Sequence, residues 1–491
     1  MSKIRELFSD SMIYGLSSVV ARFINYLLVP FYTKFFDPAE YGVIGLIYAA
    51  IVFLNVIYTF GMESAYIRYA ADSKWVKEKV FVTLQLALFG VATALGAVLY
   101  FGAGPFVMPL MSLDGSVGLH LFGMMLSILW LDALSIVPYA HLRLVRKAWI
   151  YAIIKLVNVI LNVALNLYLV IGLGWGLEAI LISNIVASAA SLLLLILVTL
   201  PMYKAAPEMA ILKTALIFGL PYVPNGIGFA INEVLDRFFL NQMDPDSILS
   251  IYGTAYSPEE ITGIYNACYK LAIFMLLMVQ MFRLAWQPFF MRYANDKSSP
   301  ELFGRIFFYF NIACTAVFLV VGLYAEYIVA LPVPFLDGTI IDQRYWSGLH
   351  IVPILLMAYW FQGWFVNFSS GIFIKEKTIR FPLITFAGAI FTVAGNIMLV
   401  PILGMAGSAI ATLVCYAVMS ILTLYYAQKV YRVNYPFISV IFMMVSGSLI
   451  VWAGYELPFM YVSPFVTRSI LLMFGFLIVV SVLVYMRRKP H

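Results

Sequence analysis

The sequence predicts an all-α integral membrane protein with about fourteen transmembrane helices. Hydrophobic residues make up 63% of its 491 residues and charged residues 11%, whereas soluble globular chains are roughly 45–50% apolar and about 25% charged. The apolar residues form continuous runs close to the roughly 20 residues that a helix needs to cross a hydrocarbon core about 30 Å thick. The connections between these runs are short, so we expect no sizeable soluble domain.

Apolar runs between polar, proline and glycine breaks place the spans along the chain. The expected cores of the first eight lie at about residues 11–32, 41–61, 80–101, 119–140, 150–171, 176–200, 213–235 and 261–286. The expected cores of the last six lie at about residues 303–330, 348–371, 381–400, 406–428, 437–455 and 466–486.

The basic residues orient these spans, because cytoplasmic loops are rich in Lys and Arg. The loops on one side, together with both termini, hold most of the 30 Lys and Arg residues. The loops on the other side hold only Lys34, Arg237 and Arg344. We therefore expect an even number of spans with both termini in the cytoplasm.

Short motifs recur in the same order in the two halves of the chain. YTKFF at 32–36 returns as LDRFF at 235–239, IRYAAD at 67–72 as MRYAND at 291–296, and NLYLV at 166–170 as NIMLV at 396–400. Spans 1–6 are thus repeated by spans 7–12 in parallel orientation, as in transporters built from two related halves. The expected domains are a six-helix lobe at 1–205, a second six-helix lobe at 206–430 and a two-helix extension at 431–491.

Polar side chains gather on one face of several spans, where a charge at bilayer depth must face protein or water. Spans 1 and 7, which are repeat partners, carry matching polar faces, and spans 2, 5 and 8 also have one polar face each. Spans 1, 2, 7 and 8 should line a hydrated cavity, with span 5 as a further candidate wall. The candidate cavity residues are Arg22, Asn25, Asn225, Asn232, Lys270, Gln280 and Arg283.

Acidic residues on the same helices are candidates for ion coupling, namely Glu63, Glu233 and Asp236. Structural interpretations stay open beside these. Asp236 and Arg237 would form a local charge pair, Glu63 would pair with Arg68, and the asparagines would join helices by hydrogen bonds. Near the span ends, the long basic side chains would reach the interface, and these are Lys155, Arg305 and Arg468.

Sequence motifs for catalysis are absent. The chain has no P-loop, H-E-x-x-H or G-x-S-x-G motif, its four histidines are scattered, and its three cysteines lie singly in apolar stretches. The basic residues lie in short loops rather than on one soluble surface, which excludes a nucleic-acid partner. We therefore expect no enzyme, no metal site and no cofactor.

Three segments carry a resemblance to a known family. They are FFDPAEYG at 35–42, DRFF at 236–239 and NIMLVPILGMAGSAIAT at 396–412. With them the chain resembles the Wzx-like oligosaccharide flippases of the polysaccharide transporter family, in the superfamily of the multidrug extruders (MATE) and the lipid II flippase. The resemblance implies a MATE-like bundle of two six-helix lobes that alternate between inward-open and outward-open states, with two further C-terminal helices.

The same resemblance implies a substrate, an undecaprenyl-diphosphate-linked oligosaccharide carried from the cytoplasmic to the outer leaflet of the bacterial inner membrane. Membrane lipids, a proton or sodium ion, and other polysaccharide-assembly proteins are the implied partners. In relatives that flip lipid II, cavity arginines lie on helices 1, 2 and 8. Arg22 matches on helix 1 and Lys270 or Arg283 on helix 8, but helix 2 has only Arg68 at its cytoplasmic end. This favours a lipid-linked glycan other than lipid II.

Other functions remain open from the sequence alone. A MATE-like extruder of small cationic drugs would use acidic cavity residues. A membrane glycan polymerase or ligase would normally place its catalytic residues in a large outer loop, and the outer loops here are modest. For spans 13 and 14, the resemblance implies a groove that holds the lipid tail.

Overall fold

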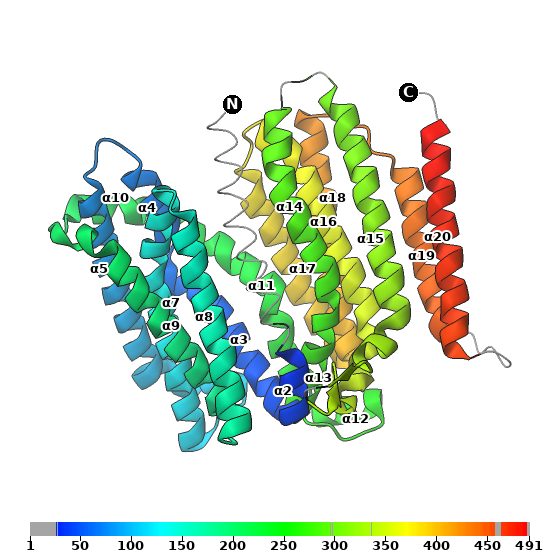
Figure 1. The fold of residues 1–491 in the computed structure, drawn as a ribbon, viewed down its shortest axis with the longest axis horizontal. Coiled ribbons are helices and arrows are strands. Elements are labelled where there is room, and N and C mark those ends of the chain that lie inside the picture. The colour runs from blue at the N-terminus through cyan, green and yellow to red at the C-terminus, as the bar shows by residue number, and fades with distance from the viewer. Residues whose placement is uncertain are drawn as a thin grey trace. The chain divides into compact units, whose positions relative to one another are not determined.

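The computed structural model describes residues 26 and 28–488 except 295, 297, 335 and 457–462. The described residues are almost all helical (Figure 1). Packing separates two compact units, which divide after Asn266. The predicted lobe boundary lies earlier, at 205/206, and the division into 1–205, 206–430 and 431–491 stays a prediction from the repeat.

The first unit consists of helices joined by short turns. Its α-helices are α2 (Val29–Phe35), α3 (Pro38–Thr59), α4 (Met62–Ala70), α5 (Lys77–Val98), α6 (Gly104–Val107), α7 (Gly115–Leu144), α8 (Ala148–Leu167), α9 (Leu177–Thr199), α10 (Met209–Gly219), α11 (Tyr222–Asn241), α12 (Pro245–Tyr252) and α13 (Pro258–Tyr269), which runs into the second unit. The shorter elements are π-helices η1 (Leu99–Ala103) and η3 (Tyr168–Gly172) and 3₁₀-helices η2 (Met108–Met111) and η4 (Leu200–Lys204).

The second unit adds the rest of the helices and one small hairpin. Its helices are the 3₁₀-helices η5 (Lys270–Ala272) and η6 (Gln343–Ile351) and the α-helices α14 (Ile273–Arg292), α15 (Ser299–Val329), α16 (Val352–Ile374), α17 (Arg380–Leu403), α18 (Met405–Val430), α19 (Phe437–Glu456) and α20 (Pro464–Arg488). Strands β1 (Pro332–Val333) and β2 (Gly338–Thr339) pair antiparallel, with Pro332 opposite Thr339.

The described helices confirm the predicted membrane-spanning class. Twelve are long and apolar enough to cross a membrane, and the pair of α10 and α11, which is bent by 44°, brings the number to thirteen if it counts as one span. These helices coincide with the predicted spans from the second to the fourteenth, while the first predicted span lies largely outside the described residues. The bend between α10 and α11 falls at Pro221, where the ring removes a backbone donor and interrupts the helical hydrogen bonds.

The FFDPAEYG segment starts α3. The Asp37 carboxylate accepts a hydrogen bond from the Glu40 amide at 2.8 Å, and the Glu40 carboxylate accepts one from the Asp37 amide at 3.1 Å. Pro38 occupies the first helical position, where no amide proton is needed. The segment therefore sets where span 2 begins, and α3 ends at Phe60 and Gly61, which both have positive φ.

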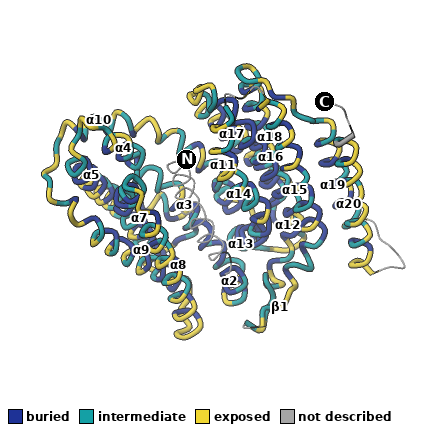
Figure 2. The backbone as a smooth tube through the Cα atoms, turned by 45° about the horizontal axis from the view of Figure 1, so that its top comes forward, coloured by how far each residue is buried: buried dark blue, intermediate teal, exposed yellow. Residues whose placement is uncertain are grey.

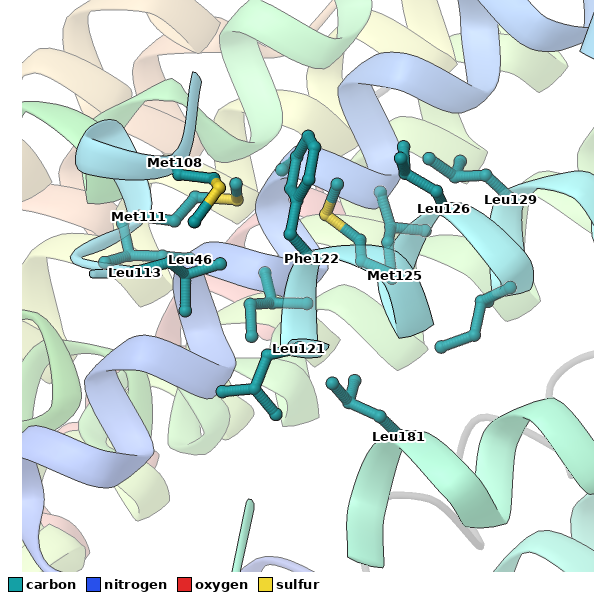
Figure 3. Packing of buried hydrophobic residues seen from close by; sticks show 14 of the residues in the cluster. Leu46, Met108, Met111, Leu113, Leu121, Phe122, Met125, Leu126, Leu129 and Leu181 are labelled. Carbon is teal, nitrogen blue, oxygen red and sulfur yellow. The ribbon is translucent and has the colours of Figure 1, made fainter. Parts of the chain in front are cut away.

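One hydrophobic core cluster of the first unit lies between α3, α7 and η2, and a second lies between α4, α5, α7 and α10. Figure 3 shows Met108 and Met111 packing beside Phe122 and Met125, with Leu46 of α3 nearby. Outside this core, exposed residues lie along many helices (Figure 2). Large apolar side chains are among them, for example Phe101 at 83% and Phe106 at 80%. Exposed apolar surface on this scale is typical of helices that face lipid.

Arg468 of α20 ties the C-terminal helices to α15. Its guanidinium forms an ion pair with Glu326 at 2.7 Å, donates to the Gly454 carbonyl at 3.3 Å and lies 4.6 Å from the ring centre of Tyr455. The side chain is 6% exposed. The predicted extension of Arg468 to the interface is therefore wrong, because α15 and α19 provide partners that the local sequence does not reveal.

Replacing Arg468 with alanine should loosen α20 from α15. We expect the free energy of unfolding to fall by about 1–3 kcal/mol, since the variant loses charge-assisted hydrogen bonds. Thermal unfolding of the purified protein in detergent measures this loss. Arg432→Ala, which removes an exposed arginine before α19, is the control, and equal unfolding temperatures for the two variants would contradict the role of Arg468.

Candidate functional site

A buried ion pair lies on α11 of the first unit. Arg237 Nη1 contacts Asp236 Oδ1 at 2.9 Å, and the two side chains are 8% and 5% exposed. The Tyr265 hydroxyl donates to Asp236 Oδ2 at 2.7 Å, and Arg237 Nε donates to Asn266 Oδ1 at 3.5 Å. The structure therefore contains the local charge pair between Asp236 and Arg237 that the sequence offers as a structural interpretation of Asp236.

Three further candidates share α11 with this pair. Asn232 is buried and Glu233 is half-buried, and the Glu233 carbonyl accepts a hydrogen bond from Arg237 at 2.9 Å. Asn225 Oδ1 is buried and accepts no hydrogen bond within the described residues. A buried amide oxygen without a donor is costly, so Asn225 is the α11 residue with free capacity for a ligand or water.

The basic candidates of span 8 lie in the second unit. Lys270 is the first residue of η5 and is half-buried, whereas Gln280 and Arg283 follow on α14, half-buried and exposed respectively. The 3₁₀ turn interrupts the helix between Lys270 and the two later residues. Arg22 and Asn25 lie outside the described residues, so the assignment of all seven cavity residues stays a prediction.

Glu63 does not pair with Arg68. On α4 it forms an ion pair with Arg143 of α7, while the Arg68 guanidinium stands 4.6 Å from the ring centre of Phe218. The Glu63 carboxylate is thus already matched by a cation. An ion-coupling role for Glu63 would require that pair to open.

One asparagine of α8, Asn166, forms hydrogen bonds within α8 and to α2. Asn166 is fully buried; its Nδ2 donates to the Asn162 carbonyl at 2.8 Å, and its Oδ1 accepts from the Tyr32 hydroxyl at 3.0 Å. Asn166 therefore joins α8 to α2, as the hydrogen-bonding interpretation of these residues predicts.

Lys155, on the same face of α8, is half-buried and faces α7. Its Nζ is 4.3 Å from the ring centre of Tyr139, and its charge interacts with those of Asp132 and Glu63. Asp132 of α7 accepts a hydrogen bond from Ser188 at 2.9 Å. The sequence interpretation passed over Asp132, although a carboxylate within the apolar run WLDAL of a span was a signal that could have found it.

Helix α3 approaches α13 closely at the predicted outer end of the first unit. A methyl group on Gly42 would overlap the Glu259 carbonyl, and one on Gly263 would overlap the Pro38 carbonyl. Only glycine permits two backbones to approach this closely. Near the same end, the Ser112 hydroxyl donates to the Glu259 carboxylate at 2.6 Å.

Ser112 also binds α11, because Asn241 Nδ2 donates to the Ser112 hydroxyl at 3.0 Å. We call the following set of residues, from α3, α11, α13 and the end of η2, the outer contact: Pro38, Gly42, Ser112, Asn241, Glu259 and Gly263. By the repeat it joins span 2 to spans 7 and 8, which the sequence assigns to the other lobe. The sequence analysis did not predict the outer contact.

Metal ligands do not gather in the described part of the chain, where no three His, Cys, Asp or Glu side chains are placed to hold an ion.

Solved structures with the same fold come from membrane transporters. The lipid II flippase MurJ in an inward closed conformation is similar over 97% of this chain and 99% of its own, with a TM-score of 0.73 at 13% identity. A MATE family multidrug transporter of the MOP superfamily is similar in its inward-facing conformation over 85% of this chain and 94% of its own, with a TM-score of 0.61 at 15% identity. A MATE family transporter in an outward-facing conformation gives a TM-score of 0.56 at 15% identity, over 87% and 94%. These likenesses confirm the MATE-like fold.

No curated protein sequence matches the chain. The model of the family described as "Polysaccharide biosynthesis protein" matches residues 7–294, more than half of the chain. The resemblance that the three sequence segments carry is thereby confirmed, and the chain belongs to the polysaccharide biosynthesis protein family.

Proposed function

We propose that this protein is a flippase that carries an undecaprenyl-diphosphate-linked oligosaccharide from the cytoplasmic to the outer leaflet of the bacterial inner membrane. The observation that carries the proposal is the combination of membership in a polysaccharide biosynthesis family with a fold shared along 97% of the chain with a lipid II flippase. Both termini then lie in the cytoplasm, as the distribution of Lys and Arg predicts.

The substrate would be held by its diphosphate. A diphosphate cannot cross hydrocarbon unaided, and basic side chains in a low-dielectric cavity bind it strongly. Arg22, Lys270 and Arg283 are the residues proposed for this contact, with Asn25, Asn225, Asn232 and Gln280 as hydrogen-bonding neighbours. Alternating access of the two repeated lobes would present them first to the cytoplasm and then to the outer side.

The lipid tail would follow the C-terminal helices. A cavity of about 810 Å³ in the second unit lies between α15, α16, α18 and α19, and its walls include Phe318, Met357, Leu413 and Val451. Helix α19 (span 13) forms one wall of this cavity, which Glu326, His350 and Glu456 also line. Its apolar walls support the proposal that the C-terminal helices help to hold the polyprenyl chain.

Charge distinguishes this function from extrusion of cationic drugs. An extruder of cations needs carboxylates that are free to exchange partners, but Asp236 and Glu63 are already paired with Arg237 and Arg143. This favours an anionic substrate. Extrusion of a cationic dye by a protein that moves no lipid-linked oligosaccharide would reverse that choice.

Arg22→Ala and Lys270→Ala should each slow flipping by about 10- to 100-fold, because a hydrogen bond to a charged group contributes about 1.5–3 kcal/mol. The measurement uses protein reconstituted in vesicles with a fluorescent lipid-linked oligosaccharide, whose exposure on either leaflet is followed with a membrane-impermeant quencher. Lys375→Ala, which removes an exposed cation in the connection between α16 and α17, is the control. Native rates in both cavity variants would overturn the diphosphate assignment, and no flipping by the unmodified protein would overturn the proposed function.

A further inference from the structure

A cavity of about 450 Å³ lies in the second unit between α15, α20 and the connection from α18 to α19. Helices α19 and α20 run along one edge of this unit (Figure 1). The apolar part of the cavity wall includes Phe308 of α15 and Leu483 and Met486 of α20. Such walls favour hydrocarbon over water, and the helices around them span a membrane, so a lipid chain suits this part of the cavity.

Arg305 of α15 lies at the same cavity, near the end of the hydrocarbon core. The 31 residues of α15 make it about 46 Å long at 1.5 Å per residue, so it extends about 8 Å beyond each side of a core about 30 Å thick. Arg305 lies about 9 Å along α15 from Ser299 and is exposed. Its guanidinium is therefore at the depth of lipid headgroups, where it can bind a phosphate through two hydrogen bonds.

The connection that closes the cavity is held firmly against α15. A methyl group on Gly304 would lie 2.4 Å from the Asn434 carbonyl oxygen. The Gln428 side chain braces the same turn, because its Nε2 donates to the Val433 carbonyl at 2.7 Å and its Oε1 accepts from the Val433 amide at 3.1 Å. The exposed side chain of Asn434, which lines the cavity, thus has a fixed place from which it can donate a hydrogen bond.

Charge favours an anionic ligand over a zwitterionic one. The cavity also contains the exposed carboxylate of Glu301, which could accept the ammonium of a zwitterionic headgroup. However, the segments 299–309, 431–436 and 483–489, which carry the lining residues, contain Glu301 as their single acidic residue and five basic residues, namely Arg305, Arg432, Arg487, Arg488 and Lys489. Basic pockets between helices on the cytoplasmic side attract anionic headgroups.

Contacts between α15 and α20 lie near the other end of these helices. Arg468 pairs with Glu326 at 2.7 Å, and the hydroxyl groups of Tyr324 and Ser469 are 2.7 Å apart. The cavity lies between the same two helices where α15 begins and α20 ends. A lipid bound there would support α20 at the end opposite Arg468.

We propose that this cavity binds one anionic phospholipid, with its phosphate on Arg305 and Asn434 and an acyl chain between α15 and α20. The lipid comes from the cytoplasmic leaflet, because the distribution of Lys and Arg predicts this end of the unit to be cytoplasmic. Binding does not depend on the proposed flippase activity, and it is measured without a lipid-linked oligosaccharide.

Native mass spectrometry of the purified full-length protein with added phosphatidylglycerol tests the phosphate contact. We expect one tightly bound lipid, and Arg305→Ala should weaken its binding by about 10- to 100-fold, because hydrogen bonds to a charged group are lost. Arg305→Lys, which keeps the charge, should weaken it less. Arg292→Ala, which removes an exposed arginine at the end of α14, is the matched control and should bind as the unmodified protein does.

Equal affinity in Arg305→Ala and the unmodified protein would overturn the assignment of the phosphate. If Arg305→Ala does not fold, Arg305→Gln, which keeps most of the side-chain length, takes its place. Leu483→Trp tests the acyl chain separately, because it fills the apolar part of the cavity and leaves Arg305 unchanged. Unaltered phosphatidylglycerol binding by Leu483→Trp would overturn the placement of the chain between α15 and α20.

Thermal unfolding in detergent with different additives identifies the ligand. Phosphatidylglycerol should raise the unfolding temperature of the unmodified protein but not that of Arg305→Ala, since a ligand stabilises the state that binds it. Phosphatidylcholine and inorganic phosphate should have little effect. An equal rise with phosphatidylethanolamine would overturn the choice of an anionic headgroup, and an equal rise with inorganic phosphate would overturn the choice of a lipid. Displacement of phosphatidylglycerol by undecaprenyl diphosphate would mean that the cavity is a substrate site instead.

Discussion

Asp236→Ala should be the most destabilising single substitution among the candidate residues, lowering the free energy of unfolding by about 3–5 kcal/mol. The reason is Arg237, whose side chain is 8% exposed and would remain buried without its counter-charge. The Tyr265 hydroxyl would also lose its acceptor. Thermal unfolding in detergent, compared with the unmodified protein, measures the loss.

The double variant Asp236→Leu with Arg237→Leu tests whether the loss of stability in Asp236→Ala comes from a buried charge left without its partner. Replacing both partners of a buried ion pair with apolar residues is often neutral or stabilising, so the double variant should unfold close to the unmodified protein. If Asp236→Ala unfolds normally but changes only transport, Asp236 is an ion-coupling residue and the structural account of the pair is wrong.

The spans could be predicted from the sequence because each is a local property of about 20 consecutive residues. Hydrophobic runs placed thirteen of the fourteen predicted cores on helices of the described chain, and the bent pair α10–α11 was expected as one span. The bend itself was missed. It falls at Pro221, where apolar residues on either side continue the hydrophobic run across the break.

The partners of charged residues could not be predicted in the same way, because they depend on which helices are neighbours. Glu63 and Arg68 are five residues apart, which places them about 140° apart around a helix and on different faces. Glu63 therefore meets Arg143 of α7 instead. Asp132 and Ser188 are likewise joined only by the packing of α7 against α9.

The outer contact could not be predicted from the sequence either, because it depends on how closely two helices approach each other. Gly42 and Gly263 are ordinary span residues in the sequence, yet in the structure each lies against a backbone carbonyl of the facing helix. Nothing in hydrophobic periodicity marks a glycine as the site of a close approach. Such positions become visible only once the two helices are placed together.

Gly263→Leu should open the outer contact and nearly abolish flipping. The leucine side chain would collide with the Pro38 carbonyl, which belongs to the backbone and cannot rotate away. Overpacking of this kind costs about 1–3 kcal/mol, enough to change the ratio of closed to open states by about 5- to 150-fold. A protein held open at its outer end cannot return to the cytoplasmic-facing state that receives substrate.

Labelling of Asn241→Cys by a membrane-impermeant maleimide reports that opening. Asn241 is 5% exposed beside Ser112, and the native cysteines are all buried, so the reagent should reach position 241 slowly in the closed state and much faster with Gly263→Leu. Gly90→Leu is the matched control, since a side chain there meets nothing within 4 Å. Equal labelling in the two leucine variants would mean that the contact between α3 and α13 does not close the outer end, because the collision at Pro38 would then have been absorbed without separating the helices.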